Sequence, residues 1–233
     1  MQSAIEQLWR GGGGQPVVIL AHSMGNLLTQ RFLTHYVSPS WKSKYVARWI
    51  ACAPPFGGAA VAVRSVLSGY NFGVPVLTNG EGLELAPFMG STFYLLPQNA
   101  SMWGPLVQTV QGESFGADDF GRLFNLTGLP HAQERVASAA ATWSTLDPGV
   151  EVVIAAGAGL PTESSYVYDE RAFGIGPIKV TVESGDGTVT LRSALLPITD
   201  FDWSNVSSQV FVKAEHVAIL QNAQFLSWLL QNM

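Results

Sequence analysis

The sequence lacks several features that would place it in common classes of protein. Its single cysteine, Cys52, excludes an internal disulfide and a zinc site built from several cysteines. No run of about 18 apolar residues occurs, so a membrane-spanning helix is not expected. The first residues have no basic region followed by an apolar stretch, so they do not match a secretory signal peptide.

Charge is also scarce, because Asp, Glu, Lys and Arg make up only 12% of the 233 residues. The formal net charge of −5 argues against a nucleic-acid partner, which would need a basic surface. Apolar residues make up 47% of the chain. A chain of this length and composition can bury a sizeable core, either as one large domain or as a core with an insertion.

Strand-like and helix-like segments alternate along the chain. Short apolar runs bounded by turn residues predict buried strands, and apolar residues at helical spacing predict helices. This alternation predicts an α/β fold with a parallel sheet. Strands are expected at residues 16–21, 46–53, 150–156 and 209–214, a hairpin at 165–170 and 178–183, and helices at 3–10, 24–36, 58–67, 131–143 and 217–230.

Residues 70–111 differ from the rest, since Glu81 and Glu84 are their only charged residues. The segment is rich in Gly, Pro, Leu, Phe and Met and has no sustained periodicity. A long irregular apolar segment of this kind is typical of a lid, a binding loop or an insertion. Plain packing against the core is the alternative interpretation.

The run V-V-I-L-A-H-S-M-G-N at residues 17–26 places Ser23 between a buried strand and a helix. The pattern small-x-Ser-x-Gly in this context is typical of a nucleophile elbow, with Ala21 in place of the usual first glycine. The neighbours Ala21 and Gly25 must be small so that strand and helix can approach. The Met24 N–H then points to where an oxyanion would form. A serine that merely caps the helix is the alternative.

A serine nucleophile needs a base, and four histidines are available. His216 follows the last predicted strand in K-A-E-H-V-A-I-L, where an α/β-hydrolase keeps its base. His22 is expected to be a scaffold residue that points away from Ser23. His35 lies about three turns along the following helix. His131 is expected to be a surface or capping residue.

The orienting acid is expected between the serine and the histidine in the chain. Asp186 in S-G-D-G-T-V follows a predicted strand, and its flanking glycines allow a tight loop. An ordinary turn is the alternative interpretation of G-D-G. Asp147, Asp200 and Asp202 also satisfy the chain order. Asp147 precedes a strand, and the other two lie in an aromatic loop without a clear strand before them.

Several motifs in order make the chain resemble the lecithin:cholesterol acyltransferase family: A-H-S-M-G-N, L-L-T-Q-R-F-L, W-K-S-K-Y-V-A-R-W-I, A-P-P-F-G-G, G-D-G-T-V and E-H-V-A-I-L. The resemblance implies an α/β-hydrolase fold with Ser23 as nucleophile, Asp186 as acid and His216 as base. It also implies a lid or cap over an acyl-chain tunnel. The expected organisation is core at residues 1–69, lid or cap at 70–130 and core at 131–233.

The sequence departs from that family at its N-terminal side. The family places well over a hundred residues before the nucleophile, including the first strands and the loop with the other oxyanion donor. Only about twenty residues precede Ser23 here. The resemblance therefore implies an N-terminally truncated chain with an incomplete sheet. A short variant, or a partner chain that completes the site, is the alternative.

The function that the resemblance implies is transfer of a fatty acyl group from a phospholipid to a lipid alcohol or water, through an acyl-serine. The expected partner is a phospholipid or other acyl lipid at a membrane surface, in the secretory pathway, in a lysosome or vacuole, or on a membrane. No metal or cofactor is implied. The alternatives are a soluble small-ester hydrolase and an inactive fragment that binds lipid or a partner. The sequons at Asn99, Asn125 and Asn205 would matter only in a secretory protein.

Overall fold

The computed structural model describes residues 1–70, 78–129 and 131–233 of the chain. The chain divides into two compact units. Unit 1 comprises Met1–Phe56, Ser144–Leu160 and Leu191–Met233, and unit 2 comprises Gly57–Trp143 and Pro161–Thr190. Each unit is therefore built from segments that are distant in the sequence, and each is described separately below.

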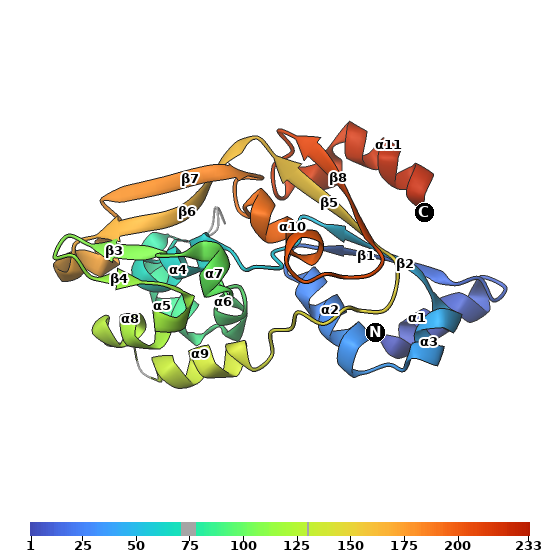
Figure 1. The fold of residues 1–233 in the computed structure, drawn as a ribbon, viewed down its shortest axis with the longest axis horizontal. Helices are drawn as coiled ribbons and strands as arrows, with labels where there is room; N and C mark the ends of the chain where they lie inside the picture. The colour runs from blue at the N-terminus through green and yellow to red at the C-terminus, as the bar shows by residue number, and fades with distance from the viewer. Residues whose placement is uncertain (71–77, 130) are drawn as a thin grey trace. The chain divides into compact units, whose positions relative to one another are not determined.

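Unit 1 is built on a parallel sheet of four strands in the order β1-β2-β5-β8 (Figure 1). The strands are β1 (Val17–His22), β2 (Val46–Cys52), β5 (Val152–Ala158) and β8 (Val206–Val212). Every residue of β5 is buried, which explains why its sequence is continuously apolar. The α/β class that the sequence predicts is confirmed, with the strand–turn–helix arrangement of an α/β-hydrolase core.

Helices cover both faces of this sheet. Phe225 and Leu229 form one apolar cluster with Ile50 and Phe211 of the strands. Successive residues of a strand point to opposite faces, so Trp49 lies on the other face from Ile50. There its ring packs against the rings of Phe56 and Trp203. The helices of unit 1 are α1 (Gln2–Gly11), α2 (Gly25–His35), α3 (Pro39–Tyr45), α10 (Leu191–Thr199), the 3₁₀ helix η4 (Ala218–Gln221) and α11 (Ala223–Asn232).

Two predicted boundaries in unit 1 are wrong. The last strand begins at Val206, before the predicted residue 209, because V-S-S-Q is a polar run on an edge strand whose residues are largely exposed. The predicted helix 217–230 is two helices. Asn222 interrupts it with an extended backbone at ψ 124°, and its side chain accepts hydrogen bonds from the N–H groups of Gln224 and Phe225.

All four strands of this sheet run directly into a residue with positive φ at their carboxyl ends. These residues are Ser23 (φ 54°), Ala53 (φ 46°), Gly159 (φ 80°) and Lys213 (φ 59°). Only one of the four is glycine, the residue that adopts this conformation without steric cost. Conformational strain is therefore stored along the carboxyl edge of the sheet, where α/β proteins place their sites.

Unit 2 contains a second sheet in the order β4-β3-β6-β7, together with short helices (Figure 1). In this sheet β3 pairs antiparallel with β4 and parallel with β6. The expected hairpin at 165–170 and 178–183 corresponds to the neighbouring strands β6 and β7. The elements are α4 (Ala60–Ser68), α5 (Asn79–Leu85), η1 (Ala86–Phe88), α6 (Gly90–Tyr94), α7 (Ala100–Trp103), β3 (Val107–Thr109), β4 (Ser114–Phe115), η2 (Ala117–Asp119), α8 (Phe120–Leu126), α9 (Ala132–Ala140), β6 (Leu160–Tyr168), η3 (Glu170–Ile175) and β7 (Lys179–Gly185).

The core of unit 2 is aromatic, with Phe93, Phe120, Phe124, Tyr166 and Tyr168 all buried in one cluster. The expected lid or cap at 70–130 falls in unit 2, apart from residues 71–77 and 130, which lie outside the described residues. Short helices occupy much of the segment whose sequence showed no periodicity. Helices of four to seven residues are too short to impose a recognisable pattern.

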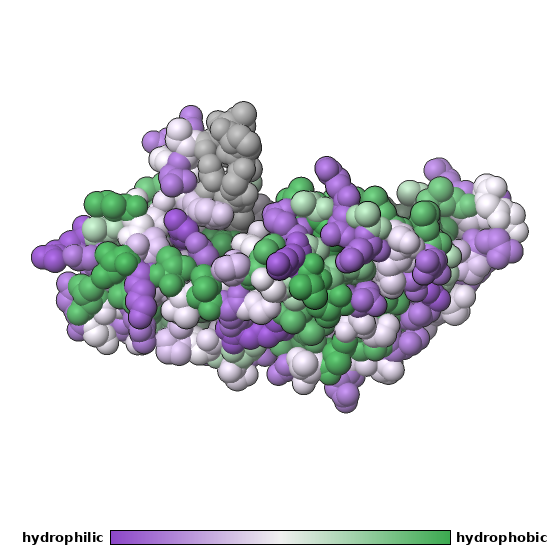
Figure 2. Space-filling model, turned by 90° about the horizontal axis from the view of Figure 1, so that it is seen from above, coloured by the Kyte–Doolittle hydropathy of each residue, from purple (hydrophilic) through white to green (hydrophobic). Residues whose placement is uncertain are grey.

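Apolar side chains also remain at the surface. Ile175 and Ile178 before β7 and Val182 within it are 88%, 64% and 51% exposed. The face in Figure 2 shows apolar side chains interspersed with polar ones. Within the described ranges, no helix has both the length and the apolar character needed to cross a bilayer.

Candidate active site

Ser23 lies in the sharp turn between β1 and α2 with a left-handed backbone. Its N–H donates to the carbonyl of Cys52 at 3.0 Å, which fixes the turn to the end of β2. A Cβ atom added at Gly25 would lie 3.9 Å from the Cβ of Ala21, so these two small residues face each other across the turn. This geometry is that of a nucleophile elbow.

Asn26 stabilises the turn at Ser23 through hydrogen bonds of its side chain, which is fully buried. Its Nδ2 donates to the carbonyls of Ser23 and Cys52, both at 2.9 Å. Its Oδ1 accepts a hydrogen bond from Trp49 Nε1 at 3.2 Å. One amide therefore joins the turn, the first helical residues and the neighbouring strand, and it offsets part of the strain at Ser23. Sequence reasoning missed this residue, although it closes the motif A-H-S-M-G-N.

His216 lies beside Ser23, with 2.8 Å between His216 Nε2 and Ser23 Oγ. The histidine sits in the loop between β8 and η4 and is buried. Glu215 orders that loop, since its carboxylate accepts hydrogen bonds from the N–H groups of Val217 and Ala218. The structure thus brings a serine hydroxyl and an imidazole within the distance needed for proton transfer.

Met24 precedes the first residue of α2. Among the residues that the structure describes, no carbonyl accepts a hydrogen bond from the Met24 N–H. A helix N-terminus offers such donors together with a favourable dipole for negative charge. Met24 therefore has the position expected of one oxyanion donor.

The other three histidines have different surroundings. His35 and His131 lie on exposed parts of the chain, beside Thr34 and Glu134 respectively. His22 is closer to the site, because its Nε2 lies 2.7 Å from the carbonyl oxygen of His216. Its ring is also packed against that of His216, with centroids 5.1 Å apart. The role expected for His22 from sequence, a scaffold residue, omits this contact.

Asp186 belongs to unit 2 and follows β7 immediately. Its side chain is 2% exposed, and its Oδ1 accepts hydrogen bonds from the N–H groups of Thr188 and Val189 at 2.9 and 2.7 Å. The Gly187 N–H donates to Thr162 Oγ1, which anchors the loop to β6. Asp186 is thus a buried carboxylate in a tightly ordered loop at the carboxyl end of a strand.

The three aspartates considered as alternatives to Asp186 lie before strands of the unit 1 sheet. Asp147 precedes β5, and its carboxylate accepts hydrogen bonds from the N–H of Ser204 and the N–H of Gly149. Burial raises its pKa, but these hydrogen bonds outweigh burial and hold the pKa below its ordinary value. Asp200 and Asp202 precede β8. All three therefore lie toward the amino ends of the strands, whereas Ser23 and His216 follow the carboxyl ends.

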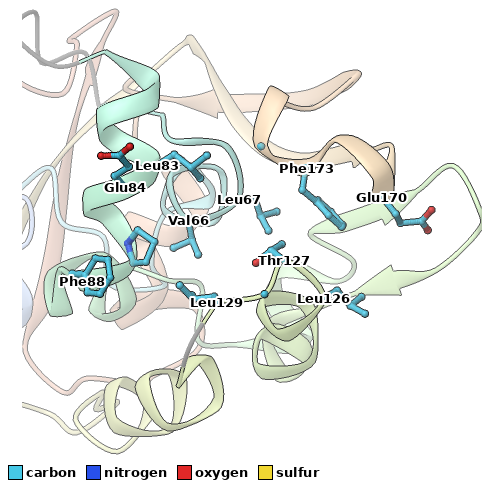
Figure 3. A pocket seen from close by; sticks show the side chains of 13 residues that line it. Val66, Leu67, Leu83, Glu84, Phe88, Leu126, Thr127, Leu129, Glu170 and Phe173 are labelled. Carbon is cyan, nitrogen blue, oxygen red and sulfur yellow. The ribbon is translucent and has the colours of Figure 1, made fainter.

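Unit 2 also contains a pocket of about 460 Å³ (Figure 3). Its wall is mainly apolar, with Val66, Leu67 and Leu83 among its residues. The carboxylates of Glu84 and Glu170 point away from the apolar side chains at its centre (Figure 3). Within the described part of the chain, no group of three or more His, Cys, Asp or Glu residues could hold a metal ion.

Comparisons with known proteins agree with the sequence motifs. Residues 1–122 match the family model described as lecithin:cholesterol acyltransferase. Lysosomal phospholipase A and acyltransferase from Bos taurus is 32% identical over 98% of this chain and 56% of its own length. Phosphatidylcholine-sterol acyltransferase from Mus musculus is 30% identical over 78% of this chain and 42% of its own length.

A solved structure, the crystal structure of the Tle4-Tli4 complex, supports the fold alone. Its TM-score is 0.60 at 13% sequence identity, and the match covers 95% of this chain and 61% of that chain. The chain spans about half the length of the curated relatives it matches, 56% in the first case. The family model covers more than half of the residues, so the chain belongs to the lecithin:cholesterol acyltransferase family.

Proposed function

We propose that the protein is a serine-dependent acyltransferase and phospholipase that moves a fatty acyl group from a phospholipid to a lipid alcohol or to water. The observation that carries the proposal is the 2.8 Å contact between Ser23 Oγ and His216 Nε2 at a nucleophile elbow. Family membership supports the acyl-lipid substrate, because relatives bear the names of a phospholipase A and acyltransferase and of a phosphatidylcholine-sterol acyltransferase.

The acylation step begins when His216 Nε2 takes the proton of Ser23 Oγ. The oxygen then attacks the ester carbonyl of the lipid and forms a tetrahedral oxyanion. The Met24 N–H stabilises this oxyanion as one of its donors. Collapse breaks the ester bond, and the departing alcohol takes the proton from His216. The acyl group remains on Ser23 as an ester.

The second step repeats this chemistry with an incoming acceptor. His216 removes a proton from water or from a lipid alcohol, and the resulting oxygen attacks the acyl-serine. The Ser23 oxygen leaves and recovers its proton from His216. In this scheme Asp186 stabilises the imidazolium and fixes its tautomer. Exclusion of water from the site favours transfer to the alcohol over hydrolysis.

A fluorophosphonate probe tests the nucleophile directly. We expect it to label the purified protein at Ser23 and to leave Ser23→Ala unlabelled. Ser43→Ala is a matched control, because Ser43 lies on the exposed part of α3 and bonds only locally, to the Ser40 carbonyl. A folded wild-type sample that takes no label would contradict the proposal and favour an inactive binding protein.

Phospholipid vesicles then separate the remaining alternatives. We expect release of fatty acid from vesicles, and formation of an acylated alcohol when a lipid alcohol is added. A probe-reactive protein that hydrolyses short-chain esters but not vesicle phospholipid would instead be a small-ester hydrolase. Both assays use the same Ser23→Ala variant as the background measurement.

A further inference from the structure

His22 provides a second link between the nucleophile and the base. It is the last residue of β1 and precedes Ser23 in the chain. Because the His216 carbonyl can only accept, the 2.7 Å contact requires a proton on His22 Nε2. His22 thus donates to the backbone of the residue whose side chain faces Ser23.

We propose that His22 is a positioning residue, which holds the His216 backbone so that the imidazole stays aligned with Ser23 Oγ. The inference rests on the proposed function and adds to it a residue that acts through the base. The dipeptide His22-Ser23 then supplies both the nucleophile and the tether of its base. Motion of the turn carries both partners together.

The loop that carries His216 makes such a tether important. Its start at Lys213 has a left-handed backbone, and Ala214 anchors it in the core of unit 1. Its end is fixed by the Glu215 carboxylate, which accepts a hydrogen bond from the N–H of Ala218, the first residue of η4. The hydrogen bond from His22 joins the middle of this loop to the strand that carries the nucleophile. A misplacement of about 1 Å between reacting groups costs on the order of 10²-fold in rate.

Two substitutions of His22 separate hydrogen bonding from packing. His22→Leu fills much of the same space but cannot donate. His22→Gln places an amide NH₂ at about the same distance from the backbone as the imidazole Nε2 and can donate to the carbonyl. His35→Leu is the matched control, because His35 lies on an exposed turn of α2 away from the site.

The experiment measures kcat and KM for ester hydrolysis and the rate of fluorophosphonate labelling. We expect His22→Leu to lower kcat and labelling by about 10–100-fold with KM unchanged, and His22→Gln to restore both to within about threefold of wild type. Thermal melting of each variant identifies any that fail to fold.

The inference is overturned if folded His22→Leu keeps the wild-type kcat, or if His22→Gln is as slow as His22→Leu. If His22→Leu does not fold, the decision rests on His22→Gln against His22→Asn, whose shorter amide cannot reach the carbonyl; equal rates in these two overturn it. A wild-type protein without activity or labelling contradicts the proposed function instead, so the two failures are distinguishable.

Discussion

At the residue scale, the elbow depends on one buried amide. Asn26 satisfies two carbonyls and one indole N–H at the point where Ser23 adopts a strained backbone. A buried polar network of this kind stabilises when every member is paired and costs free energy when one member is removed. The proposed nucleophile therefore relies on a neighbour that has no part in the proposed chemistry.

Replacing Asn26 should destabilise the protein strongly. We expect Asn26→Ala to lower the free energy of unfolding by about 2–4 kcal/mol, since three hydrogen bonds of about 1 kcal/mol each are lost and their partners stay buried. Asn26→Asp should cost more, because a carboxylate would face two carbonyl oxygens. Urea unfolding measures both, with Asn232→Ala near the C-terminus as the control. A loss below about 0.5 kcal/mol in Asn26→Ala would contradict the role assigned to the network.

Asp186 and Asp147 make a matched pair for testing the acid. Asp186→Asn keeps an oxygen for the N–H groups of Thr188 and Val189, so the loop should hold its shape. We expect kcat to fall by about 10³–10⁴ while the melting temperature changes little, because the amide no longer fixes the imidazole tautomer. Asp147→Asn should lower the melting temperature and leave kcat unchanged. Steady-state kinetics and thermal melting of both variants decide the assignment; an unchanged kcat in Asp186→Asn would remove Asp186 from the mechanism.

Local sequence predicts part of this site and misses the rest for a physical reason. The apolar run before Ser23 and the small residues around it are local signals, and the structure has the predicted strand and turn there. The hydrogen bonds of His22 and Asn26 reach partners 194 and 26 residues away, so no local pattern encodes them. The role of Asp186 stays a prediction.

At the element scale, each regular strand of the parallel sheet is followed at its carboxyl end by a residue with positive φ. Gly159 follows β5, and a Cβ atom added there would meet the Val212 Cγ1 atom at 3.5 Å, an ordinary contact. The cost of a side chain at this position is therefore the positive φ of 80° rather than a steric clash.

Two Gly→Ala substitutions should change the free energy of unfolding in opposite directions. We expect Gly159→Ala to lower the free energy of unfolding by about 1–2 kcal/mol, which is the cost of a left-handed alanine. Gly11→Ala should raise it by up to about 1 kcal/mol, because Gly11 ends α1 with open space around it and the unfolded chain loses freedom. Chemical denaturation compares the two. Equal effects would show that the backbone at Gly159 relaxes to accept alanine.

The elements of the core were predictable where burial produces a strong pattern. The runs of β2 and β5 are apolar because these strands are largely buried, and the predicted positions of β1, β2 and β5 are confirmed with small shifts at the ends. The burial predicted for β1 is wrong, because β1 is an edge strand whose residues are mostly only partly buried and Leu20 is 47% exposed. The start of β8 was not predictable, since an exposed edge strand tolerates V-S-S-Q. The break at Asn222 was hidden because the apolar spacing continues across it.

At the scale of the whole molecule, the free energy of unfolding should decrease as the pH rises into the alkaline range. Two buried tyrosines of unit 2 carry the effect. Burial raises the pKa of Tyr166 well above its ordinary value, with the neighbouring Glu163 adding to the shift. Burial likewise raises the pKa of Tyr168 to about 12, although its hydrogen bond with Ser68 opposes the shift.

The sign of the dependence follows from proton binding. Above pH 10 the unfolded chain loses phenolic protons that the folded protein retains, so the free energy of unfolding falls as pH rises. We expect a decrease between pH 10 and about 12, to which each tyrosine contributes up to about 1.4 kcal/mol per pH unit. Tyr168→Phe should make the decrease less steep in urea titrations at these pH values. A decrease of the same steepness in the variant would contradict the assignment.

The left-handed residues that follow the four parallel strands also indicate where this protein can be re-engineered. The left-handed conformation of Ser23 belongs to its proposed role as nucleophile, and the position after β5 already has glycine, Gly159, which suits this backbone. Ala53 and Lys213 remain as the two positions where glycine would relax the edge without touching a reacting atom. They are the natural first substitutions for a thermostable form of the protein, and any loss of the proposed activity in them would measure how much rigidity the site draws from strain.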